Sequence, residues 1–163
     1  MISSGSWSAM YNECMHFAVS IISEENEIDV LRGKKSFSHN FEYAYDEKTI
    51  GFLKKNLKEE GNCYLIAKSG DAFAGFCSVD TQWWEDGYFF LREIFIDPAY
   101  QQQGLGELLM RRCIDHAREH GAKGIVTETA FENMPMQKLC EKCGFVPWEN
   151  PQWKEGITYK LSF

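Results

Sequence analysis

The stretch that decides the fold is Ile94-Phe95-Ile96-Asp97-Pro98-Ala99-Tyr100-Gln101-Gln102-Gln103-Gly104-Leu105-Gly106. Its first three residues end an apolar run that begins at Tyr88 and predicts a β-strand. Pro98 has no N–H for a strand ladder, so the strand is expected to end at Asp97-Pro98. From Gly104 to His120, apolar residues recur at helical spacing, and Gly121 follows where a helix would end. The stretch therefore joins a strand to an amphipathic helix through a glycine loop.

The loop has the properties of an anion site. Gly104 and Gly106 carry no side chain, so a ligand can approach the backbone closely. The amides of the first helical turn point toward such a ligand, and the helix dipole adds about half a positive charge there. A pyrophosphate can therefore bind at this loop without a lysine. The alternative is that the two glycines only permit a tight turn.

The rest of the chain alternates helix and strand patterns. Helices are predicted over residues 11–23, over residues 46–60 with Asp46 as N-cap, and from Asn133 to Lys142. Residues 24–40 are polar and predict a loop or a short helix. Further strands are predicted at residues 63–68, 72–81, 125–129, 145–148 and 157–163. This order of elements predicts a mixed α/β fold.

Two motifs in this order resemble those of a known family. Residues 94–106 look like the acetyl-CoA motif of the GNAT superfamily of N-acetyltransferases, in which a strand ending in hydrophobic-x-Pro leads into Arg/Gln-x-x-Gly-x-Gly/Ala. Residues 133–145, which read Asn-Met-Pro-Met-Gln-Lys-Leu-Cys-Glu-Lys-Cys-Gly-Phe, are similar to the family segment Asn-x-x-Ala-x-x-Leu-Tyr-x-x-x-Gly-Phe. One predicted strand separates the motifs, and with the preceding hairpin the resemblance covers roughly residues 60–148.

The resemblance implies a fold and an activity. The expected fold is one domain over residues 1–163, with a mixed, largely antiparallel sheet that is splayed at its fourth and fifth strands and flanked by helices. The expected activity is transfer of the acetyl group of acetyl-CoA to a primary amine, which would be a small cationic amine, an aminoglycoside-like compound or a peptide amine. The alternative is a catalytically weak acyl-CoA-binding module with a regulatory role.

The resemblance also assigns the residues that would bind acetyl-CoA. Backbone groups of Ile94 and Ile96 would bind the pantetheine arm as an added strand, and an amide near Phe95 would stabilise the oxyanion. Asn133 would contact the cofactor from beyond the fifth strand. Gln101 stands at the Arg/Gln position of the motif. The amides that would hold the pyrophosphate are those of Gln102, Gln103, Gly104, Leu105, Gly106 and Glu107.

Three residues are candidates for moving protons. Glu128 occupies the position at which acetyltransferases of protein N-termini carry a glutamate, and we prefer it to Glu93 as the general base. For either residue the alternative is a salt bridge or a solvent-facing strand position. Cys140 stands where the family often has a tyrosine that protonates the leaving thiolate. Cys140 is therefore a candidate acid, and the alternative is a packing residue with solvent as the acid.

An aromatic pair suggests where the acceptor would bind. Trp83 and Trp84 precede Glu85 and Asp86, so stacking and charge together would suit a cationic amine. The alternative is a hairpin whose tryptophans cover the sheet. Cys140 and Cys143 also form a C-x-x-C pair, but it lies at the end of a predicted helix and has no second pair for zinc. We interpret this pair as coincidental and expect no metal.

Composition limits the possible partners. The net charge of −7 argues against nucleic acid as a partner, because phosphate binding needs a basic surface. No run of 18 apolar residues exists, so no membrane-spanning helix is expected. Three of the six cysteines, Cys63, Cys77 and Cys113, lie in apolar stretches. The chain is too large and core-rich to need a disulfide framework, so a reducing compartment is expected, and no signal peptide is apparent. We therefore expect a cytoplasmic protein that is a monomer or a homodimer.

Overall fold

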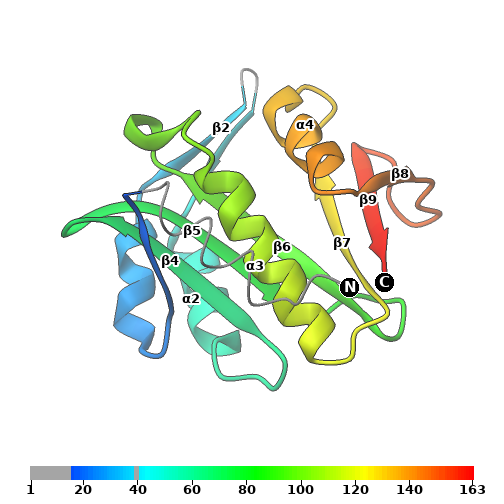
Figure 1. Ribbon diagram of the computed structural model, residues 1–163, viewed down its shortest axis with the longest axis horizontal. Helices are drawn as coiled ribbons and strands as arrows, with labels where there is room; N and C mark the ends of the chain where they lie inside the picture. The colour runs from blue at the N-terminus through cyan, green and yellow to red at the C-terminus, as the bar shows by residue number, and fades with distance from the viewer. Residues whose placement is uncertain (1–15, 39–40) are drawn as a thin grey trace.

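The chain folds around one seven-stranded sheet, as the computed structural model shows for residues 16–38 and 41–163 (Figure 1). The strand order is β1-β4-β5-β6-β7-β9-β8, and β2 and β3 form a separate two-stranded hairpin. The strands of the main sheet are β1 (Ala18–Ile21), β4 (Cys63–Ser69), β5 (Ala72–Asp80), β6 (Tyr88–Ile96), β7 (Gly124–Thr129), β8 (Val146–Trp148) and β9 (Ile157–Ser162). The hairpin strands are β2 (Lys35–Ser38) and β3 (Phe41–Ala44).

Helices cover the two faces of this sheet. The long helix α3 (Leu105–Glu119) crosses one face, with α4 (Met134–Lys142) on the same side, and α2 (Glu47–Asn56) lies behind the sheet (Figure 1). Two short 3-10 helices, η1 (Glu25–Leu31) and η2 (Pro98–Tyr100), complete the fold. One apolar core packs α3 and α4 against the sheet, and a second core packs η1 and α2 against the opposite face of β4, β5 and β6. The predicted mixed α/β fold is confirmed.

The sheet opens between β6 and β7. These two strands are parallel, whereas all other pairs are antiparallel, and they pair only over Tyr88–Phe90 and Gly124–Val126. Beyond Val126, β7 continues beside β9, while β6 continues beside β5 as far as Ile96. Figure 1 shows the two strands diverging under α3 and α4. The expected splay is therefore confirmed, because β6 and β7 are the strands that the family resemblance numbers fourth and fifth.

A β-bulge in β6 decides which side chains share a face. Ser78 pairs with Glu93 and Val79 with Leu91, so Arg92 is an extra residue without a partner on β5. Before the bulge, Leu91 packs into the core under α3, and after it Ile94 and Ile96 do. Phe95 packs into the core on the α2 side. The extra residue therefore puts Arg92 and Glu93 on the same face, the one opposite α3.

The prediction for residues 11–23 is wrong where the structure describes them. A helix was expected, but Ala18–Ile21 form the strand β1, which pairs with β4 at the edge of the sheet. Phe17 and Val19 pack into the core under α3, and Ile22 is buried in the other core. The helix-like spacing thus has two causes. Phe17 and Val19 alternate along a strand, and Ile22, after the strand, packs into the core on the opposite face of the sheet. The expected helical residues 11–15 lie outside the described residues.

Other boundaries differ by smaller amounts. Asp46 is the N-cap of α2 and accepts a hydrogen bond from the Thr49 amide at 2.8 Å, as predicted. The helix ends at Asn56 rather than near residue 60, because the Leu57 amide bonds to the Lys54 carbonyl and tightens the last turn. Residues 24–40 contain the short helix η1, one of the two expected forms, and also β2, which was not predicted. This strand pairs with β3 alone, outside the main sheet.

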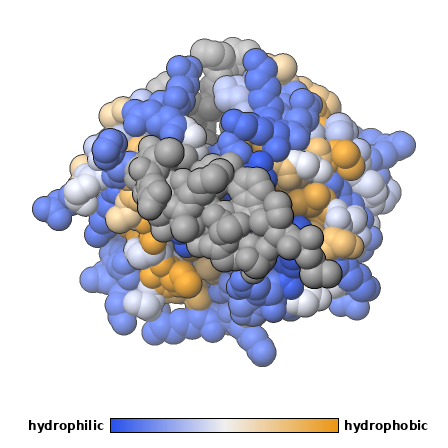
Figure 2. Space-filling model, viewed as in Figure 1, coloured by the Kyte–Doolittle hydropathy of each residue, from blue (hydrophilic) through white to orange (hydrophobic). Residues whose placement is uncertain are grey.

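The surface of the α3 side is mainly hydrophilic. Polar and charged residues make up most of the visible periphery, with smaller apolar patches between them (Figure 2). Most large apolar side chains lie instead in the two cores on either side of the sheet. In the described part of the chain, none of the helices has both the length and the hydropathy that a membrane crossing requires.

Candidate active site

The loop after β6 turns the chain sharply into α3. Asp97 begins the turn by accepting a hydrogen bond from the Ala99 amide at 3.0 Å. Gln102 has a φ of 60° and Gly104 a φ of 81°, so the backbone is twice in the left-handed region before the helix begins. A side chain at Gly104 would strain this conformation, which explains the need for glycine there. The loop from Gln101 to Gly104 is exposed.

The N-terminus of α3 has donors available for an anion. Gly104 is its N-cap and cannot cap the helix with a side chain, and the first amide bonded within the helix is that of Leu108, which donates to the Gly104 carbonyl at 3.1 Å. The amides of residues 105–107 therefore have no acceptor within the helix. The buried side chain of Leu105 anchors this turn in the core. A Cβ at Gly106 would lie 3.3 Å from Leu139, so this glycine also lets α3 and α4 pack closely.

The edge of β6 that faces the opening is available to an extended ligand. No strand of the described chain pairs with β6 on its β7 side beyond Phe90. The Thr127 hydroxyl bridges the opening near its closed end by donating to the Leu91 carbonyl at 3.0 Å. At the other end, the Gln101 side-chain amide donates to the Ile96 carbonyl at 3.2 Å. Main-chain groups between these points can bind a ligand as an added strand.

Asn133 lies at the start of α4, in the turn that follows β7. Its side-chain oxygen accepts a hydrogen bond from the Met136 amide at 3.3 Å, so Asn133 is the N-cap of the helix. Gln137, one turn later, is buried and donates to the carbonyls of Phe131 at 2.7 Å and Ala130 at 3.3 Å. Together these two residues hold the turn between β7 and α4.

Both candidate bases lie on the face opposite α3. Glu93 accepts a hydrogen bond from the Tyr45 hydroxyl at 3.1 Å, and its amide donates to the Ser78 hydroxyl at 3.2 Å. Glu128 is half-buried on β7 and accepts a hydrogen bond from the Asn150 side chain at 3.3 Å. Burial raises the pKa of Glu128 above its ordinary value, and the positive charge of Arg92 acts in the opposite direction.

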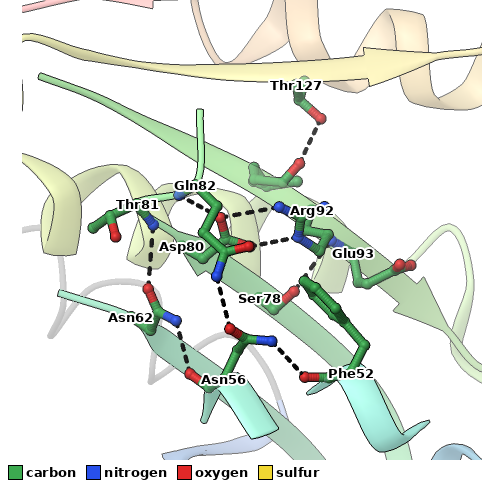
Figure 3. A network of polar contacts seen from close by, with 11 residues as sticks. Phe52, Asn56, Asn62, Ser78, Asp80, Thr81, Gln82, Arg92, Glu93 and Thr127 are labelled. Atoms are coloured by element: carbon green, nitrogen blue, oxygen red, sulfur yellow. Dashed lines mark hydrogen bonds and ion pairs between the residues drawn. The ribbon is translucent and has the colours of Figure 1, made fainter. Parts of the chain in front are cut away.

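Arg92 belongs to a polar network on the same face (Figure 3). Its Nε and Nη2 donate to the two carboxylate oxygens of Asp80, at 2.5 and 3.2 Å, and Asp80 is only 1% exposed. The Gln82 amide also donates to Asp80, at 2.9 Å, and the Gln82 side chain donates to Asn56 on α2 at 2.7 Å. The guanidinium group lies 4.9 Å from the ring centroids of Phe52 and Phe90. Arg92 is thus fixed in one orientation.

Cys140 lies inside the core and not at the opening. Its side chain is fully buried, and burial raises the pKa of the thiol to about 12. Cys143 is also buried, and burial raises its thiol pKa as well. Among the side chains that the structure describes, no cluster of three or more His, Cys, Asp or Glu could hold a metal ion.

The tryptophans form an aromatic wall, made up of Trp83, Trp84, Phe90 and Trp148. Trp83 stacks on Phe90 with ring centroids 5.2 Å apart, and Trp84 lies 5.5 Å from Trp83 and 6.0 Å from Trp148. Trp84 is 47% exposed, so a surface of this wall is open to solvent. Lys160 lies 4.4 Å from the Trp148 ring and pairs with Glu85 at 2.6 Å.

Comparison with known proteins gives the family. The model of the acetyltransferase (GNAT) family matches residues 11–145, which include the loop, the opening and α4. The chain belongs to the acetyltransferase (GNAT) family. The family resemblance predicted from residues 94–106 and 133–145 is thereby confirmed.

Individual relatives of this GNAT chain are distant. It is 31% identical to a putative ribosomal protein bS18-alanine N-acetyltransferase of Bacillus subtilis, over 52% of this chain and 54% of the relative. It is 25% identical to human N-acetyltransferase 8, over 56% of this chain and 42% of the relative. The chain thus spans about half the length of these relatives. A putative streptothricin acetyltransferase from Bacillus anthracis, solved with acetyl coenzyme A, shares the fold, with a TM-score of 0.67, 21% identity, and coverage of 92% of this chain and 99% of that one.

Four polar residues of this GNAT site were not predicted from the sequence. They are Tyr45, Asp80, Arg92 and Asn150. One signal was present in the sequence, because the adjacent charges Arg92-Glu93 interrupt the apolar strand Tyr88–Ile96. Two charged neighbours in a strand would normally point to opposite faces, so such a pair can indicate a bulge. Tyr45 and Asn150 come from distant segments and gave no comparable signal.

The Asp80–Arg92 pair is expected to stabilise the fold measurably. Replacing Asp80 with asparagine should lower the free energy of unfolding by about 1–3 kcal/mol, because Arg92 and the Gln82 amide lose a buried charged acceptor. Urea unfolding of both proteins measures the difference. The control is Glu149→Gln, since the exposed Glu149–Lys154 pair should contribute less than about 0.5 kcal/mol. Equal losses in the two variants would contradict this expectation.

Proposed function

We propose that the chain is an N-acetyltransferase that transfers the acetyl group of acetyl-CoA to a primary amine. One observation carries the proposal: the open edge of β6 runs directly into a left-handed glycine turn at the N-terminus of α3. An extended arm and a pyrophosphate are the two parts of CoA that such an edge and such a turn would bind. The acetyl-CoA bound in the Bacillus anthracis structure supports the choice of ligand.

The residues present fit acetyl-CoA as a substrate. Main-chain groups of Ile94 and Ile96 would bind the pantetheine arm, and the Ile96 carbonyl would exchange its bond to Gln101 for one to the ligand. The amides of residues 102–107 would hold the pyrophosphate, with the unbonded amides of residues 105–107 as the strongest donors. Asn133 would act beside the arm as the residue that fixes the start of α4.

Glu128 is our proposed general base, with Glu93 as the second candidate. When bound, acetyl-CoA supplies an activated thioester. The acceptor ammonium would give a proton to Glu128, and its nitrogen would then form a bond to the acetyl carbon. The carbon–sulfur bond would break to release CoA as a thiolate, and the nitrogen would lose a second proton to solvent as the amide forms. An amide near Phe95 would donate a hydrogen bond to the developing oxyanion. Burial supports Glu128, because a carboxylate with a raised pKa is a stronger base.

Cys140 and solvent are the two candidates for the acid that protonates the leaving thiolate. The Cys140 thiol is fully buried in the core, and burial raises its pKa to about 12, so the thiol is poorly placed to exchange a proton with the site and we expect solvent to act. Cys140→Ala should therefore keep kcat within about threefold, while the small cavity lowers the stability by about 1 kcal/mol. Steady-state turnover and thermal unfolding measure the two effects. A kcat loss of tenfold or more would identify Cys140 as the acid.

The function is tested by binding and by turnover. Titration calorimetry with CoA should show binding, and acetyl-CoA with a panel of amines should release free thiol. The panel should contain spermidine, an aminoglycoside, a peptide with a free α-amine, and amino acids. Binding without turnover would favour the alternative of a catalytically weak acyl-CoA-binding module. Absence of CoA binding would overturn the proposal.

A further inference from the structure

The face opposite α3 carries groups of both charges close together. The bulge in β6 places Arg92 and Glu93 on this face, side by side. Glu128 shares it, because Ile125 of β7 packs under α3 and residues alternate along a strand. The aromatic wall adjoins these residues through Phe90, which contacts both Trp83 and Arg92. This face therefore combines a guanidinium group, two carboxylates and a large apolar surface.

Arg92 keeps hydrogen-bonding capacity after its structural contacts are made. Asp80 accepts from Nε and Nη2, which leaves the donors of Nη1 without a partner among the described residues. The side chain is 25% exposed, and the rings of Phe52 and Phe90 limit its movement. Asp80 is almost fully buried, so it holds the guanidinium plane from behind and does not reach solvent itself. A fixed guanidinium edge with unused donors is suited to bind a carboxylate.

We propose that Arg92 determines the acceptor class by binding the carboxylate of an amino acid. The proposal rests on the proposed acetyltransferase function. The α-amine of the acceptor lies toward Glu93 and Glu128, its carboxylate lies on the outer edge of Arg92, and its apolar side chain lies against the aromatic wall. A polyamine fits this face less well, because one of its ammonium groups would lie beside the positive charge of Arg92.

The neighbouring charges support this assignment. Lys160, the cation beside the aromatic wall, is paired with Glu85 at 2.6 Å and has its ammonium group over the rings of Trp148 and Tyr88. Arg92, whose side chain is 25% exposed against 11% for Lys160, is thus the more accessible of these two cations. Asp80 is 1% exposed, whereas Glu93 and Glu128 are partly exposed. The negative charges of Glu93 and Glu128 would therefore attract an ammonium group, although each already accepts a hydrogen bond.

The test compares acceptors that differ only in the carboxylate. Wild-type protein should acetylate phenylalanine with a kcat/KM about tenfold or more above that for phenethylamine, which lacks the carboxylate. Arg92→Met should lower kcat/KM for phenylalanine by about tenfold, mainly through KM. The same variant should change kcat/KM for phenethylamine by less than about twofold. Arg92→Lys keeps the charge beside Asp80 and should retain part of the preference. Arg118→Met, on the exposed face of α3, is the control and should leave kcat/KM unchanged for both acceptors.

Each result decides between defined alternatives. Equal kcat/KM for the two acceptors in the wild type would overturn the proposal and leave the acetyltransferase function intact. If Arg92→Lys and Arg92→Met each lose the same factor in kcat/KM for both acceptors, Arg92 only supports the fold. That result would also overturn the proposal that Arg92 binds the acceptor carboxylate. If no thiol is released with either acceptor or with any amine of the panel, both proposals are overturned. If Arg92→Met does not fold, the wild-type comparison and Arg92→Lys decide the question.

Discussion

Replacing Glu128 with glutamine is expected to lower kcat by about 10²- to 10⁴-fold, the usual contribution of a positioned general base. Glutamine keeps the shape of the side chain and an oxygen for the Asn150 contact at 3.3 Å, so the fold should be little affected. Because burial raises the pKa of Glu128, the wild-type kcat/KM should fall with decreasing pH at a higher pH than for an exposed glutamate. This acid limb should disappear in the variant. Thiol release across pH measures both effects.

Two further variants decide which carboxylate is the base. Glu93→Gln should lose less activity than Glu128→Gln and should keep the acid limb, although it loses a charged acceptor for the Tyr45 hydroxyl. Glu119→Gln, on the exposed end of α3, should have wild-type rates. Wild-type turnover in Glu128→Gln together with a large loss in Glu93→Gln would assign the base to Glu93.

The half of the site that we propose binds acetyl-CoA could be predicted from sequence because its information is local. Residues 94–106 contain the end of a strand, a proline stop and a glycine turn, and each has a direct backbone consequence. Gly104 is in the left-handed region at the N-cap of α3, where the pattern placed it. The second motif was equally local, since Asn133 caps α4 within its own first turn.

The half of the site that we propose for the acceptor could not be predicted because it depends on distant residues and on register. One extra residue in β6 moves Glu93 to the face of Arg92, and the adjacent charges Arg92-Glu93 are only an indirect sign of that shift. Tyr45, Asp80 and Asn150 reach the face from three other segments of the chain. The error at Ala18–Ile21 has a similar cause, because an edge strand and a turn between two cores imitate helical spacing.

Replacing Gly104 with valine is expected to weaken CoA binding by about 30-fold or more. A β-branched residue at a φ of 81° costs about 1–2 kcal/mol, so the turn should relax toward negative φ. That relaxation moves the amides of residues 105–107 away from the pyrophosphate, and charge-assisted hydrogen bonds worth about 1.5–3 kcal/mol each are weakened. Titration calorimetry with CoA measures the loss, and thermal unfolding measures the strain.

The strain and the binding effect can be separated with a glycine at the other end of the same helix. Gly121 has a φ of 74° and no atom within 4 Å of a Cβ placed on it, so Gly121→Val introduces the same backbone strain without a steric clash. Both variants should lose similar stability, because each forces a β-branched residue into the left-handed region. Only Gly104→Val should lose affinity, since Gly121 lies about 25 Å along α3 from the anion site at 1.5 Å per residue. Equal CoA affinity in the two variants would show that the loop is not part of the CoA-binding site.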